Sequence, residues 1–157
     1  MRILKLALYI LAILLLQTVV FARLNLFGVC PDLVFVSVIV FAVLNKGRRV
    51  VLFALPASLL QDVLSLGIYL HTIFNLFVCV ILSVVGDGFE GNEFLFAAGF
   101  VALFTPVIFL LQYGVLAFVF GRQFSLLQLL VGFFLLEFYN LLVFPLVFMV
   151  LRKLSYE

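Results

Sequence analysis

Asp62 is the residue of this sequence with the clearest capacity for chemistry, because its carboxyl group lies within a long apolar stretch. In this stretch (VVLFALPASLLQDVLSL), Ser58 and Ser65 share one helical face with Asp62, at positions i−4 and i+3. Ionisable groups in a lipid-embedded helix are costly and are functional candidates. Two roles are open for Asp62: hydrogen bonding that fixes helix packing, or relay of protons or a substrate.

His71, the only histidine, follows Asp62 after a predicted turn at Ser65-Leu66-Gly67. A helix that starts directly after this turn returns His71 to a depth similar to that of Asp62. We therefore expect the two side chains to make contact, which lowers the cost of embedding both.

Glu137 is the second acid deep in an apolar segment, with Tyr139 and Asn140 close by. We expect it on a stripe that faces the helix bundle, hydrogen-bonded to a Gln, a Ser or a backbone group. Contact with a helix of a partner protein is the alternative.

The motifs of common enzyme and metal sites are missing from the sequence. Cys30 and Cys79 have no CxxC spacing, Asp62 has no second acid at DxxD spacing, and there is no HExxH. Residues 86–91 (GDGFEG) match GxGxxG, but they follow an apolar helix instead of a strand, and their two acids would repel a pyrophosphate. We expect no catalysis, no cofactor and no metal ion.

The composition is that of an integral membrane protein. The chain has 157 residues, of which 68% are hydrophobic and 10% charged, and its mean hydropathy is +1.46. Soluble proteins average about 25% charged residues. The cations form small clusters at the ends of apolar segments and not one basic face, so we expect no nucleic-acid partner.

The pattern of apolar segments and polar breaks predicts an all-α protein with one transmembrane domain over residues 1–157. A spanning helix needs about 20 apolar residues. The second helix opens with Pro31 and Asp32, a residue pair suited to the first turn of a helix. The expected helices are 3–22, 31–44, 50–66, 69–85, 94–120 and 126–151.

The distribution of cations predicts that both termini are cytoplasmic. Six crossings put seven Lys and Arg residues on the side of the termini and leave two, Arg23 and Arg122, on the other. Such an excess marks the cytoplasmic side.

Residues 3–22 could instead be a signal peptide cleaved after Val20-Phe21-Ala22, but their apolar stretch is long enough to span the membrane.

Three segments resemble the MreD family of rod shape-determining proteins. They are Pro31-Asp32-Leu33, the run Leu59-Leu60-Gln61-Asp62 followed by Leu66-Gly67, and residues 140–152 (NLLVFPLVFMVLR). The order and spacing of these segments cover nearly the whole chain. The sequence departs from the family at Ala54, Ala57 and Ser58, where more glycine is expected; Ala and Ser still allow close helix approach.

The resemblance implies a non-enzymatic scaffold in the bacterial plasma membrane that takes part in cell-wall elongation and the control of cell shape. Its implied partners are an MreC-like bitopic protein, an MreB-like actin homologue and the lateral-wall peptidoglycan synthases. The family's bundle is also similar to the substrate-binding subunits of energy-coupling-factor vitamin transporters, which gives the alternative function. Pro31, Asp32, Asp62, Gly67, His71 and Glu137 are the candidate residues for structural or partner contacts.

Overall fold

The computed structural model describes residues 2–21, 23, 29–45, 47–65, 69–86 and 89–156, and over these ranges the fold is helical, with no strand. The all-α prediction is confirmed for this part of the chain. The elements are α1 (Arg2–Leu15), the π-helical η1 (Leu16–Phe21), α2 (Leu33–Leu44), α3 (Arg48–Leu64), α4 (Leu70–Gly86), α5 (Glu93–Phe118) and α6 (Leu126–Tyr156).

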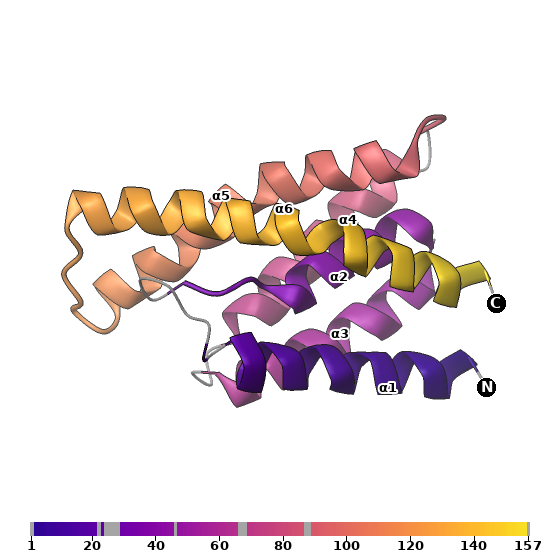
Figure 1. Cartoon of the computed structure of the whole chain (residues 1–157), viewed down its shortest axis with the longest axis horizontal. Coiled ribbons are helices and arrows are strands. Elements are labelled where there is room, and N and C mark those ends of the chain that lie inside the picture. Colours follow the sequence, from indigo (N-terminus) through magenta and orange to yellow (C-terminus); the bar gives the residue numbers. More distant parts are fainter. Residues whose placement is uncertain are drawn as a thin grey trace.

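Helix α2 lies at the centre of the bundle, in contact with α1, α3, α4, α5 and α6 (Figure 1). Its ten residues from Leu33 to Ala42 are all buried. The sequence LVFVSVIVFAVL is rich in β-branched residues, which favour strands in soluble proteins. A helix satisfies its backbone groups within itself, which an apolar environment requires, and this requirement outweighs the strand propensity.

The long helices α5 and α6 lie side by side, and α6 ends near the start of α1 (Figure 1). At this end of the bundle, Asn45 at the C-terminus of α2 donates a hydrogen bond from Nδ2 to the Ser155 hydroxyl, 3.0 Å away. The first residues of α1 and the last residues of α2 and α6 therefore share one end.

The outward surface of the bundle is apolar. Large side chains on four outer helices are more than half exposed, among them Leu8 at 58%, Leu52 at 73%, Leu110 at 67% and Leu146 at 68%. Three helical stretches in the described residues are long and apolar enough to cross a membrane: Leu4–Phe21, Glu93–Phe118 and Leu126–Ser155. Together these features are those of a membrane protein.

Several helix ends differ from the sequence prediction. Pro31 and Asp32 precede α2 and do not form its first turn; Asp32 is the N-cap, and its carboxylate accepts a hydrogen bond from the Phe35 amide. This cap satisfies an amide that a first-turn Asp would leave open. Helix α6 continues past the expected residue 151 to Tyr156. Gly67, expected in the turn after α3, lies outside the described residues.

Candidate functional site

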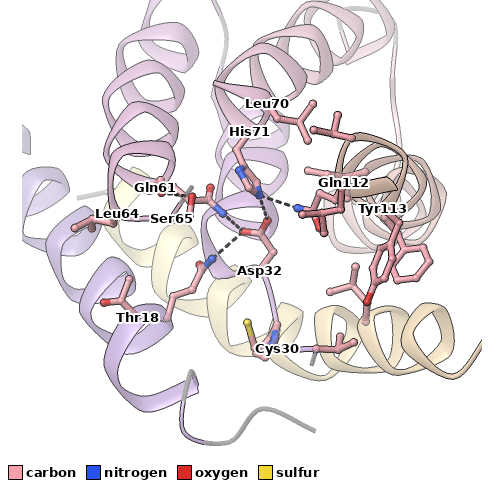
Figure 2. Close-up of a pocket in the computed structure, with 18 of the residues that line it drawn as sticks. Thr18, Cys30, Asp32, Gln61, Leu64, Ser65, Leu70, His71, Gln112 and Tyr113 are labelled. Atoms are coloured by element: carbon pink, nitrogen blue, oxygen red, sulfur yellow. Dashed lines mark hydrogen bonds and ion pairs between the residues drawn. The ribbon is translucent and has the colours of Figure 1, made fainter. Parts of the chain in front are cut away.

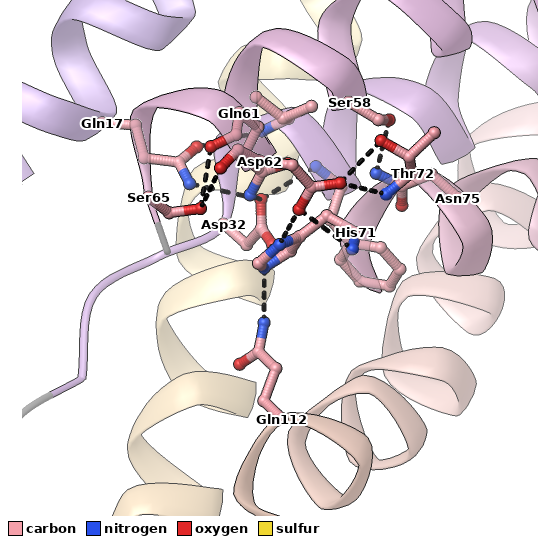
Figure 3. Close-up of polar contacts among 12 residues, drawn as sticks. Gln17, Asp32, Ser58, Gln61, Asp62, Ser65, His71, Thr72, Asn75 and Gln112 are labelled. Atoms are coloured by element: carbon pink, nitrogen blue, oxygen red, sulfur yellow. Dashed lines mark hydrogen bonds and ion pairs between the residues drawn. The ribbon is translucent and has the colours of Figure 1, made fainter. Parts of the chain in front are cut away.

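The polar side chains of the bundle gather where η1 and α3 end and where α2 and α4 begin (Figure 3). The chain reverses direction at this end of the bundle, so helix termini with unpaired backbone groups meet there. Most of the cluster is buried, including Asp32, Gln61, Asp62 and Thr72.

Asp62 is completely buried and caps α4 from the neighbouring helix α3. Its Oδ1 accepts hydrogen bonds from the His71 amide at 3.2 Å and from His71 Nδ1 at 2.8 Å. Its Oδ2 accepts from the Thr72 amide at 2.8 Å and from the Thr72 hydroxyl at 2.6 Å. The expected contact between Asp62 and His71 is confirmed. The two amides and the Thr72 hydroxyl donate, so both oxygens of Asp62 act as acceptors.

His71 joins Asp62 to α5. Its Nε2 lies 2.7 Å from Nε2 of Gln112. An amide nitrogen can only donate, so the imidazole accepts at Nε2 and carries its proton on Nδ1, towards Asp62. The same Nε2 lies 4.0 Å from Oδ2 of Asp32, which is beyond hydrogen-bonding distance.

Asp32 connects four elements. Its Oδ1 accepts hydrogen bonds from Gln61 Nε2 in α3 at 3.0 Å and from Gln17 Nε2 in η1 at 3.5 Å, besides capping α2. Its backbone amide donates to Oδ1 of Asn140 in α6, 2.9 Å away. Asn140 in turn donates to the Thr105 hydroxyl in α5 at 3.2 Å. One buried network therefore reaches from η1 to α6.

Two buried amides of the cluster have an oxygen with no hydrogen-bond partner in the described structure, Gln61 Oε1 and Asn75 Oδ1. The nitrogen of each amide is bonded, in Gln61 to Asp32 and in Asn75 to the Ser58 hydroxyl at 2.8 Å. Buried polar atoms in native proteins usually have partners. These two oxygens are buried acceptors without a donor among the described residues.

A cavity of about 540 Å³ opens beside the cluster (Figure 2). Its polar end is formed by Asp32, Gln61, Ser65, His71 and Gln112. Its remaining walls are mainly apolar and come from α1, α3, α5 and α6, with Leu14, Leu64, Ile108, Phe109, Leu116 and Leu136. Binding sites for small molecules typically have about 300–1,000 Å³ of space, apolar walls and a few polar groups.

The cluster can bind and orient hydrogen-bonding groups, but it presents no prepared nucleophile. Ser65, which carries one of the hydroxyls of the cavity wall, donates to the Gln61 carbonyl oxygen at 2.8 Å. No group of three or more His, Cys, Asp or Glu side chains suited to a metal ion occurs in the described residues.

The structure brings together four of the six candidate residues: Pro31, Asp32 and His71 line the cavity and Asp62 lies behind His71. Glu137 is apart from them. It is half-buried on α6, and its Oε2 has no hydrogen-bond partner among the described residues, so the expected bond of Glu137 to a Gln, a Ser or the backbone stays a prediction.

Gln17, Thr72 and Gln112 are not among the residues predicted from the sequence; Gln61 appears there only within a family-like segment, and Asn140 within another such segment and as a neighbour of Glu137. The sequence contains a feature that could have identified them, since each is an uncharged polar residue within an apolar helix. Such residues hydrogen-bond across membrane helices and deserve the same scrutiny as ionisable groups.

Comparison with protein-family models, with curated proteins and with solved structures gave no match.

Proposed function

We propose that this chain is a non-enzymatic membrane scaffold of the bacterial cell-wall elongation machinery, similar to the MreD family, and that it contributes to rod shape. The observation that carries the proposal is that the three segments with the family resemblance meet at one buried network. Asp32 of the first segment binds Gln61 of the second and, through its amide, Asn140 of the third.

This convergence gives the resemblance a physical basis. The three segments are far apart in sequence, and their side chains supply hydrogen-bond donors and acceptors to one another. Asp32 needs donors for its carboxylate and an acceptor for its amide, and Gln61 and Asn140 provide them. Residues coupled in this way specify one arrangement of helices, as a scaffold with a fixed partner surface requires.

A six-span topology with both termini in the cytoplasm fits the arrangement of the helices. Helix α2, with only 12 residues, is too short to cross about 30 Å of hydrocarbon by itself. It is surrounded by protein, so the flanking helices can bear the contact with lipid. The cations of α3 and α6, such as Arg48, Arg49 and Lys153, belong to the end at which α1 begins.

The implied partners fit the apolar exterior of the bundle. A bitopic MreC-like protein would pack its single spanning helix on such a surface, while the actin homologue would meet the basic cytoplasmic end and the synthases would bind within the membrane. The bundle's own polar groups are directed inwards, which leaves its outer faces for lipid and helices.

Depletion of the protein in a rod-shaped host tests the proposal. We expect cells to lose their constant width and become round, and re-expression of the wild-type chain to restore the rods. Co-purification from native membranes, with mass spectrometry, should recover the bitopic partner. Depleted cells that kept their width and their wall-synthesis pattern would refute the scaffold function.

The cavity favours a second candidate, the substrate-binding subunit of a vitamin transporter of the energy-coupling-factor type. Such a subunit needs a cavity with convergent polar groups, and Asp32, Gln61, His71 and Gln112 converge on one. In this case, depletion would abolish uptake of one vitamin and leave cell width unchanged. The two candidates therefore predict opposite results from the same depleted strain.

A further inference from the structure

From the geometry of the cavity we infer that it binds an organic cation, a protonated amine attached to an apolar body, with the ammonium group at Asp32. The inference goes beyond the scaffold function and does not depend on it. It concerns which ligand the cavity holds, whether or not the ligand is transported.

The polar end of the cavity offers acceptors that no donor of the described structure satisfies. Asp32 is 7% exposed, and its hydrogen bonds with side chains and the Phe35 amide all go to Oδ1. Its Oδ2 has no hydrogen-bond donor among the described residues, and His71 Nε2 lies 4.0 Å from it. Gln61 is 5% exposed and lines the same cavity, and its buried Oε1 has no hydrogen-bond partner in the described structure. A ligand that satisfies the Asp32 oxygen must bring N–H or O–H donors.

The charge of the cluster favours a cationic donor over a neutral one. Two carboxyl groups, Asp32 and Asp62, lie in the cluster, and His71, which accepts at Nε2 and carries its proton on Nδ1, adds no positive charge in this arrangement. The described lining contains no Lys or Arg. Even with a protonated His71, two carboxyl groups face one cationic side chain. Such an excess of negative charge in an apolar bundle is relieved by a bound cation.

The size and lining of the cavity indicate what the ligand carries besides its ammonium group. With about 540 Å³ and walls of leucine, isoleucine and phenylalanine, the cavity is too large and too apolar for a bare inorganic ion. An amine with an aromatic or aliphatic body fills it. Two sources share this chemistry, a water-soluble amine and the ethanolamine headgroup of a phospholipid with part of its chain.

The direct test uses the purified full chain in detergent and three probes of similar size, 2-phenylethylamine, 2-phenylethanol and 3-phenylpropionate. Thermal unfolding and titration calorimetry should show binding in the order ammonium, alcohol, carboxylate. Asp32→Asn keeps an N-cap side chain and an acceptor but removes the charge. It should weaken binding of the amine by roughly 10- to 100-fold, the range for loss of a hydrogen bond to a charged group.

Glu137→Gln is the matched control, because it removes a carboxyl group of α6 that does not line the cavity. It should leave amine binding unchanged.

Native mass spectrometry with phosphatidylethanolamine and phosphatidylglycerol distinguishes the two sources of the ligand. If the protein retains only phosphatidylethanolamine and the amine displaces this lipid weakly, the ligand is a lipid headgroup. If the amine displaces the lipid readily, the ligand is a soluble amine.

The inference is overturned if the three probes bind wild type equally, if the carboxylate binds best, or if Asp32→Asn binds the amine as wild type does. Should Asp32→Asn fail to fold, the order of the three probes on wild type still decides the matter. The binding test uses the purified chain and the scaffold test uses the width of depleted cells. A negative result in one is therefore distinguishable from a negative result in the other.

Discussion

Replacement of Asp62 tests whether this carboxylate holds the bundle together. From sequence alone, a packing role predicts that Asp62→Asn is tolerated because it keeps an acceptor. The structure predicts a measurable loss instead. Both carboxylate oxygens face backbone donors, the His71 amide and the Thr72 amide, so the NH₂ group of Asn must face one of them.

The expected losses can be ranked from the contacts. Asp62→Leu removes all four hydrogen bonds and leaves two buried backbone amides without a partner, at about 1–3 kcal/mol each, so we expect about 2–6 kcal/mol. Asp62→Asn displaces one of these amides and should cost about 1–3 kcal/mol. Thr72→Val deletes only the hydroxyl contact and should cost about 1 kcal/mol. Measured hydrogen bonds between membrane helices average about 0.6 kcal/mol, which places the true losses towards the lower ends.

Thermal unfolding in detergent, followed by the loss of helical circular dichroism, measures this order. The unfolding temperatures should fall from wild type through Thr72→Val and Asp62→Asn to Asp62→Leu. An Asp62→Leu protein as stable as wild type would refute the capping role. An Asp62→Asn protein that matched wild type in stability and partner binding, yet failed to maintain cell shape, would show that the ionisable carboxyl itself is needed.

Three further predictions concern topology and packing. In a background without the two native cysteines, a thiol at Lys153 should be protected from an impermeant reagent in intact cells and one at Gln123 should react; the reverse pattern would contradict cytoplasmic termini. Asn140→Leu removes the acceptor for the Asp32 amide and should lower the free energy of unfolding by about 1–3 kcal/mol in a denaturant titration. Gly99→Ala should raise the unfolding temperature, because no described atom lies within 4 Å of the added methyl group and alanine stabilises a helix by up to about 1 kcal/mol. A lower unfolding temperature would contradict this prediction and show that the methyl group clashes with a neighbouring group.

The sequence predicts the helices well because the apolar runs and polar breaks are local signals. It also predicts the contact between Asp62 and His71, since a short turn fixes the depth of both residues. It does not predict that Asp32 meets Asn140, because the pairing depends on which faces of α2 and α6 pack together. Helix α2 is apolar on all sides, so its sequence has no face that indicates its neighbours.

The central position of α2 has a consequence for how the protein is made. During synthesis this short helix emerges after α1, before most of the helices that will surround it exist. The partners that satisfy Asp32 arrive later, Gln61 with α3 and Asn140 only with α6. Until then α2 presents a carboxylate and a span too short for the bilayer. It must wait beside the insertion machinery or at the membrane surface, and the fold is completed only when the last helix has been inserted.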